Sequence, residues 1–83
     1  MDDLNTKIEK HFEKYKINNS DQTSQEYFSG AVKIALNEYN LTVSEIASEF
    51  EVANSTVTRW ASGIAVPHPK LRQIILSYIA EKI

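Results

Sequence analysis

The chain contains no cysteine, and only two glycines and two prolines occur among its 83 residues. The absence of cysteine excludes disulfide bonds, thiolate nucleophiles and cysteine-ligated zinc or iron–sulfur sites. No apolar run approaches the roughly 20 residues that span a bilayer, and the amino terminus begins with acidic residues where a signal peptide is basic. We therefore expect a cytoplasmic protein that has no membrane span and is stabilised by packing alone.

The length of the chain allows one small domain with a single core. Its net charge is −2, and residues 1–26 account for this excess of acids. The range 52–77 contains no carboxylate, but it holds the basic residues Arg59, Lys70 and Arg72. A cationic third of the chain is therefore the place to look for an acidic partner such as nucleic acid.

Apolar spacing predicts that the chain begins with a helix. Leu4, Ile8, Phe12 and Tyr15 follow one another at intervals of four, four and three, which places them on one helical stripe. Lysines and acids occupy the other side, and the polar residues 18–22 predict a loop. We assign residues 1–25 to an amino-terminal helical extension with its loop.

Start and stop signals divide the rest of the chain, residues 26–83, into four further helices. Thr23 and Glu26 have the spacing of a capping box, and Asn40 is suited to a left-handed helix end. Gly63 is suited to a left-handed carboxyl cap, and Pro69 to the first turn of the last helix. The predicted fold is all-α, a compact domain of five helices.

Two short helices in the middle of the chain have the spacing of a helix-turn-helix. Thr42 and Glu45 predict a capping box at the start of the first, and a polar start at Asn54 follows a tight turn. The apolar residues that dock the two helices are Ile46, Ala47, Phe50, Val52, Val57 and Trp60. The second helix keeps a free face of hydrogen-bonding side chains, which suits a DNA major groove: Asn54, Ser55, Thr58, Arg59 and Ser62.

Over roughly residues 26–80 the chain resembles the helix-turn-helix regulators of the lambda-repressor and Cro type. Residues 41–47 are similar to the entry into that family's first motif helix, and residues 54–63 to its recognition helix. The segment 67–71 also fits the family pattern. Glu51 departs from it, because it stands at the turn position where the family favours glycine, and it costs about 1 kcal/mol in a left-handed conformation.

This resemblance implies a sequence-specific DNA-binding transcriptional regulator, a repressor of the phage or mobile-element type that binds double-stranded DNA. The residues that it places at base edges are Asn54, Ser55, Thr58 and Arg59. The residues that it places at phosphates are Thr42, Ser44, Thr56, Ser62, His68 and Lys70.

Several of these side chains also have a purely structural interpretation. Asn54 is equally suited to cap a helix, and Arg59 to lie in solvent, although no acid three or four residues away on its helix would pair with it. We expect His68 to cap the last helix, and His11 and Trp60 to pack against the core. The two histidines share no ligand set, and the chain has no glycine-rich phosphate loop, so we expect no enzyme activity, metal or cofactor.

The last helix has an apolar arc of roughly 200°, which is wider than one surface helix needs. Either the amino-terminal helix covers this arc or a second copy of the chain does. We expect a homodimer that binds an inverted-repeat operator, with an interface at Leu76, Ile79 and Ile83. The alternative function is a protein-interaction module, antitoxin-like or an adaptor, that uses the amino-terminal and carboxyl-terminal helices.

Overall fold

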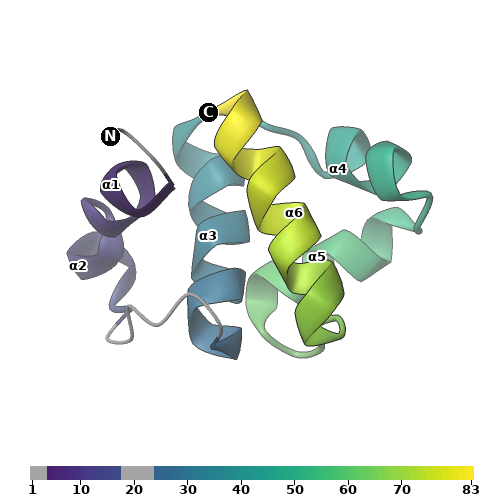
Figure 1. The fold of residues 1–83 in the computed structure, drawn as a ribbon, viewed down its shortest axis with the longest axis horizontal. Helices are drawn as coiled ribbons and strands as arrows, with labels where there is room; N and C mark the ends of the chain where they lie inside the picture. Colours follow the sequence, from purple (N-terminus) through teal and green to yellow (C-terminus); the bar gives the residue numbers. More distant parts are fainter. Residues whose placement is uncertain (1–3, 18–23) are drawn as a thin grey trace.

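The computed structural model describes residues 4–17 and 24–83, and the regular structure within these ranges is entirely helical (Figure 1). This confirms the all-α class, but the count of five helices is wrong, because the first predicted helix is two separate helices. The six helices are α1 (Leu4–Glu9), α2 (Phe12–Tyr15), α3 (Gln25–Glu38), α4 (Val43–Phe50), α5 (Asn54–Ser62) and α6 (Pro69–Lys82).

A tertiary hydrogen bond accompanies the break between α1 and α2. In a continuous α-helix the His11 N–H would donate to the Lys7 carbonyl. Instead, it donates to the Ile8 carbonyl at 3.0 Å, and the Lys7 carbonyl accepts a hydrogen bond from the Tyr39 hydroxyl at 3.1 Å. The spacing of apolar residues does not predict this hydrogen bond, because its donor, Tyr39, lies just after α3.

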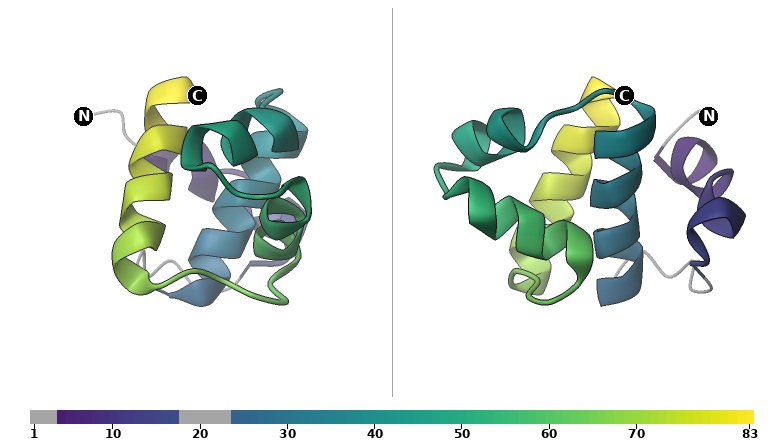
Figure 2. Two further views of the ribbon diagram at one scale, coloured as in Figure 1. Left: turned by 90° about the vertical axis from the view of Figure 1, so that its right-hand side faces the viewer. Right: turned by 180° about the vertical axis from the view of Figure 1, so that it is seen from behind.

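Helix α3 is the centre of the fold, with α1 and α2 on one side and α4, α5 and α6 on the other (Figures 1 and 2). Its capping residue is Ser24, whose Oγ accepts a hydrogen bond from the Tyr27 N–H at 3.0 Å, one residue later than predicted. Thr23 lies outside the described residues, as do the predicted loop 18–22 and the side chain of Leu4. Asn40 has a φ of 65°, so the predicted left-handed end of α3 is confirmed. The buried residues of α3 are Tyr27, Phe28, Gly30, Ala31, Val32, Ile34 and Ala35.

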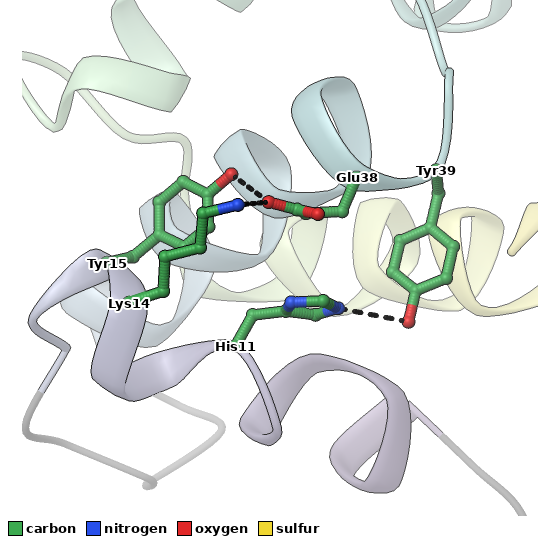
Figure 3. Close-up of polar contacts among 5 residues, drawn as sticks. All are labelled: His11, Lys14, Tyr15, Glu38 and Tyr39. Carbon is green, nitrogen blue, oxygen red and sulfur yellow. Dashed lines mark hydrogen bonds and ion pairs between the residues drawn. The ribbon is translucent and has the colours of Figure 1, made fainter.

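Polar contacts hold α2 against the end of α3 (Figure 3). The carboxylate of Glu38 accepts hydrogen bonds from Lys14 Nζ at 2.6 Å and from the Tyr15 hydroxyl at 2.8 Å. These two bonds lower the pKa of Glu38, and the same carboxylate raises the pKa of Lys14. The ring of His11 meets the edge of the Tyr39 ring, with centroids 5.7 Å apart. Thus His11 packs at this contact, as its sequence position predicted.

The apolar arc of α6 is covered mainly within the chain, because α6 lies against both α1 and α3. Leu76 and Ile79 are buried in the core, and Ile83 is half-buried against it. The prediction that Leu76 and Ile79 form a dimer interface is therefore wrong, since their side chains are already enclosed. Ile74 is the residue of this helix that exposes a large apolar side chain, with 53% of its surface accessible.

Candidate nucleic-acid interface

The first helix of the candidate motif begins as predicted. Thr42 Oγ1 accepts a hydrogen bond from the Glu45 N–H at 3.0 Å, and the Glu45 carboxylate accepts one from the Thr42 N–H at 2.9 Å. This reciprocal capping box satisfies two amides that the helix leaves without partners. On the inner side of α4, Ile46 and Ala47 are buried.

The turn between α4 and α5 contains the residue that departs from the family pattern. Glu51 has a φ of 55°, so a non-glycine residue does occupy the left-handed region here. The next residue, Val52, is half-buried against the core and donates its N–H to the Ala47 carbonyl at 3.0 Å. The capping residue of α5 is Ala53, without a side-chain hydrogen bond. The capping role considered for Asn54 is therefore not observed.

Helix α5 separates an apolar inner face from a polar outer face. Val57 and Trp60 are buried, and the Trp60 ring meets the Phe28 ring of α3 edge to face, with centroids 5.9 Å apart. The predicted core position of Trp60 is confirmed. The candidate base-contacting side chains are all exposed together on the opposite side of the helix: Asn54, Ser55, Thr58 and Arg59.

Some polar groups of this outer face are bonded within the motif. Asn54 Nδ2 lies 3.4 Å from Ser44 Oγ, which joins the starts of α5 and α4. The Thr58 hydroxyl donates to the Asn54 carbonyl at 3.2 Å, and the Ser62 hydroxyl donates to the Arg59 carbonyl at 3.1 Å. Among the described residues, no group accepts a hydrogen bond from the Arg59 guanidinium. Arg59 is thus the exposed charged group of this face.

Of the candidate phosphate-contacting residues, Thr56 is half-buried, and the others are exposed: Thr42, Ser44, Ser62, His68 and Lys70. Thr42 and Ser44 lie at the start of α4, whereas His68 and Lys70 lie at the start of α6, toward the other end of the molecule (Figure 1). His68 caps α6, as predicted, because its Nδ1 accepts a hydrogen bond from the Lys70 N–H at 3.2 Å.

Arg72 has a structural role that the sequence reasoning missed. It is 9% exposed, and it donates from Nη1 to the Pro67 carbonyl at 2.8 Å, which fixes the loop before α6. Its position could have indicated this, since residue 72 precedes Ile75, Leu76 and Ile79 at helical spacing on the buried side of α6.

No three histidine or carboxylate side chains of the described residues come together in a group that could hold a metal ion. Within the described ranges, the helices are too short or too polar to cross a membrane. Comparisons with protein families, with curated proteins and with solved structures give no match to this chain.

Proposed function

We propose that the protein is a sequence-specific DNA-binding regulator, a repressor of the phage or mobile-element type, that inserts α5 into the major groove. The observation that carries this proposal is the outer face of α5. It exposes Asn54, Ser55, Thr58 and Arg59 side by side, and the helix contains no carboxylate that would repel phosphate. Amide, hydroxyl and guanidinium groups are the donors and acceptors that read base edges.

The first residues of α4 and α6 support the proposed orientation of α5 in the major groove. Ser44 lies beside the start of α5, and Lys70 stands at the start of α6, so donors flank the recognition helix at both ends. A helix in the major groove has phosphates on both sides, and contacts to them set its register. The Glu45 carboxylate is held at the start of α4 by the Thr42 N–H, so a phosphate at this end is to be bound on the side of Ser44.

The oligomeric part of the proposal is a homodimer that pairs through the exposed strip of α6 around Ile74. Burial of an exposed isoleucine is favourable by about 1.5–3 kcal/mol, and a two-fold axis would bury two copies of it. Such a dimer presents two α5 helices to half-sites roughly 34 Å apart. Ile74→Glu should give a monomer in sedimentation, whereas Gln73→Glu, the same charge on the neighbouring exposed residue, should leave the dimer intact.

Selection from a randomised duplex library at moderate salt, followed by sequencing of the bound pool, tests the function. An enriched inverted repeat supports both DNA recognition and the dimer, and an enriched single half-site supports DNA recognition without the dimer. No enrichment would count against DNA binding. It would favour the protein-interaction alternative, which uses the amino-terminal and carboxyl-terminal helices and for which the exposed side chain of Ile74 on α6 is the specific observation.

Substitutions at the selected site then test individual roles. Arg59→Ala should lower the binding free energy at the best DNA site by about 1–3 kcal/mol and relax the preference at one base position. Lys70→Ala should weaken binding to all DNA sequences evenly and reduce the slope of log affinity against log salt concentration by about one. Lys10→Ala removes an exposed cation far from the motif in sequence and should change neither. Unchanged base preference after Arg59→Ala would remove this arginine from the reading residues.

A further inference from the structure

A pocket of about 340 Å³ lies beside the amino-terminal half of α3, where the end of α2 and the end of α5 flank it. Its volume is within the range of about 300–1,000 Å³ that is usual for small-molecule sites. None of the four proposed base-contacting residues lines it, and of the proposed phosphate-contacting residues only Ser62 does. The pocket thus meets the outer face of α5 at Ser62 alone and is otherwise separate from it.

Both glycines of the chain line this pocket. Gly30 allows the Ile17 side chain to lie directly on α3, because a Cβ at residue 30 would overlap Ile17 Cδ1. Gly63 ends α5 with a φ of 80°, and a Cβ built there would lie 3.5 Å from Ser29 Oγ. The absence of these two side chains brings three segments of the chain together around one cavity.

The pocket wall contains a polar atom without a partner. Ser29 Oγ is buried, and it makes no hydrogen bond with any described residue. A buried hydroxyl without a hydrogen bond is costly, and in native proteins such groups are rare. A rotation of the Ser29 side chain toward the pocket would let a ligand with an acceptor or a hydroxyl group satisfy it.

Two lysines are also among the residues that line the pocket. Lys16 and Lys33 line the pocket, and within the described ranges neither forms an ion pair. The last residues of α5 also line the pocket, where a helix leaves carbonyl oxygens without intrahelical donors. One part of the pocket therefore attracts an anion, and another part accepts hydrogen bonds from hydroxyl groups.

We propose that this pocket binds a small anion that also carries hydroxyl groups, of the sugar phosphate class. The anionic group pairs with Lys16 and Lys33, and the hydroxyl groups bond Ser29 Oγ and the carbonyls at the end of α5. Glu26, which also lines the pocket, disfavours ligands of higher negative charge. The inference does not rest on DNA binding, and its test contains no DNA.

The test is a titration of the uniformly ¹⁵N-labelled full chain with glucose 6-phosphate, followed by amide chemical shifts. We expect saturable shifts at Lys16, Ser29 and Gly63, with weaker binding of inorganic phosphate and of glucose. Equal affinity for inorganic phosphate would overturn the role of the hydroxyl groups. Equal affinity for glucose would overturn the role of the lysines, and the absence of saturable shifts with glucose 6-phosphate would overturn the site.

Three variants localise the binding. Lys33→Gln should weaken glucose 6-phosphate binding about tenfold or more, since a hydrogen bond to a charged group contributes more than an ordinary one. Ser29→Ala removes only the buried hydroxyl and should weaken binding by a smaller factor. Lys10→Gln makes the same charge change outside the pocket and should bind as the unmodified chain does. Equal weakening by Lys33→Gln and Lys10→Gln would show that the ligand responds to overall charge, which would overturn the proposal.

Discussion

The pairs α1–α2 and α4–α5 both pack on α3, and each pair contributes buried apolar side chains, with Ile8 of α1 fully enclosed. The difference lies between the helices α5 and α2. Helix α5 is attached through buried apolar side chains, with Val57 fully enclosed and Trp60 against Phe28. Helix α2 is attached through the half-buried ring of Phe12 and through hydrogen bonds to the exposed end of α3 around Glu38. We infer that the second attachment is weaker, because exposed ion pairs stabilise proteins little.

The two pairs also differ in where the information for their shape lies. Four consecutive residues determine where α4 starts, because the Thr42–Glu45 capping box needs no distant partner. The break between α1 and α2 instead coincides with the bond from Tyr39 to the Lys7 carbonyl, more than thirty residues away. The local sequence therefore predicts the start of α4 but not the break between α1 and α2.

The largest effect that tests this comparison should come from removal of one aromatic ring on each side of α3. Trp60→Ala should lower the free energy of unfolding by about 3–5 kcal/mol, because it leaves a cavity in the core. Phe12→Ala should cost about 1–2 kcal/mol, because its ring is only half-buried. Urea unfolding followed by circular dichroism measures both values. Equal losses would contradict the difference between the two attachments.

A medium effect should come from Gly30→Ala, which acts on the α1–α2 side alone. Alanine in a helix interior usually stabilises by roughly 0.5–1 kcal/mol relative to glycine. At this position the new Cβ would overlap the end of the half-buried Ile17 side chain, which has to turn aside, so we expect a net loss of up to about 1 kcal/mol. Hydrogen exchange should show faster opening of residues 7–17 than of α5.

The control for this substitution is the double variant Ile17→Ala with Gly30→Ala. It removes the side chain that the new methyl group would strike, so it should recover part of the stability that Gly30→Ala loses. A Gly30→Ala protein that is more stable than the unmodified chain would show that Ile17 moves without cost. The docking of α2 would then be looser than its contacts indicate.

Much of the fold could be predicted because its signals are local. Capping residues, helical spacing and the left-handed ends at Asn40 and Gly63 gave the last four helices to within about a residue or two. The positions of Leu76 and Ile79 could not be predicted in the same way. An apolar arc shows that a helix face is covered, but whether a helix of the same chain or a second copy covers it depends on the packing of the whole molecule.

In the candidate interface, too, some features follow from the local sequence and others depend on the whole fold. The outer face of α5 follows from helical spacing, since burial of Val57 and Trp60 fixes which side is free. The contact between Asn54 and Ser44 depends on the angle at which α4 and α5 cross, and this angle cannot be predicted from the spacing of residues along one helix. The pocket beside α3 likewise arises from three segments that only the fold brings together.

The smallest effect should be a pH dependence confined to the α2 attachment. The hydrogen bonds from Lys14 and Tyr15 hold the pKa of Glu38 below its ordinary value of 4.5. A carboxyl whose pKa is lowered in the folded state stabilises fully above its ordinary value, and this stabilisation is lost as the pH falls through the folded pKa. We therefore expect the protection factors of the α2 amides, in which the pH dependence of intrinsic exchange is removed, to fall below about pH 4, while those of the α5 amides change less.

At alkaline pH the same attachment is expected to weaken as the pH rises. The Glu38 carboxylate raises the pKa of Lys14 above 10.5, and burial, followed by the bond to Glu38, raises the pKa of Tyr15 above 10.0. Both contributions are present below those ordinary values and are lost as the pH rises through the folded ones, so the attachment should be strongest between about pH 5 and 10. Glu38→Gln should flatten this profile at both limits. Glu13→Gln, the same change at an exposed position of α2, should leave the profile as it is, and a flattening by both variants would mean that the net charge of the extension, rather than this contact, governs the pH response.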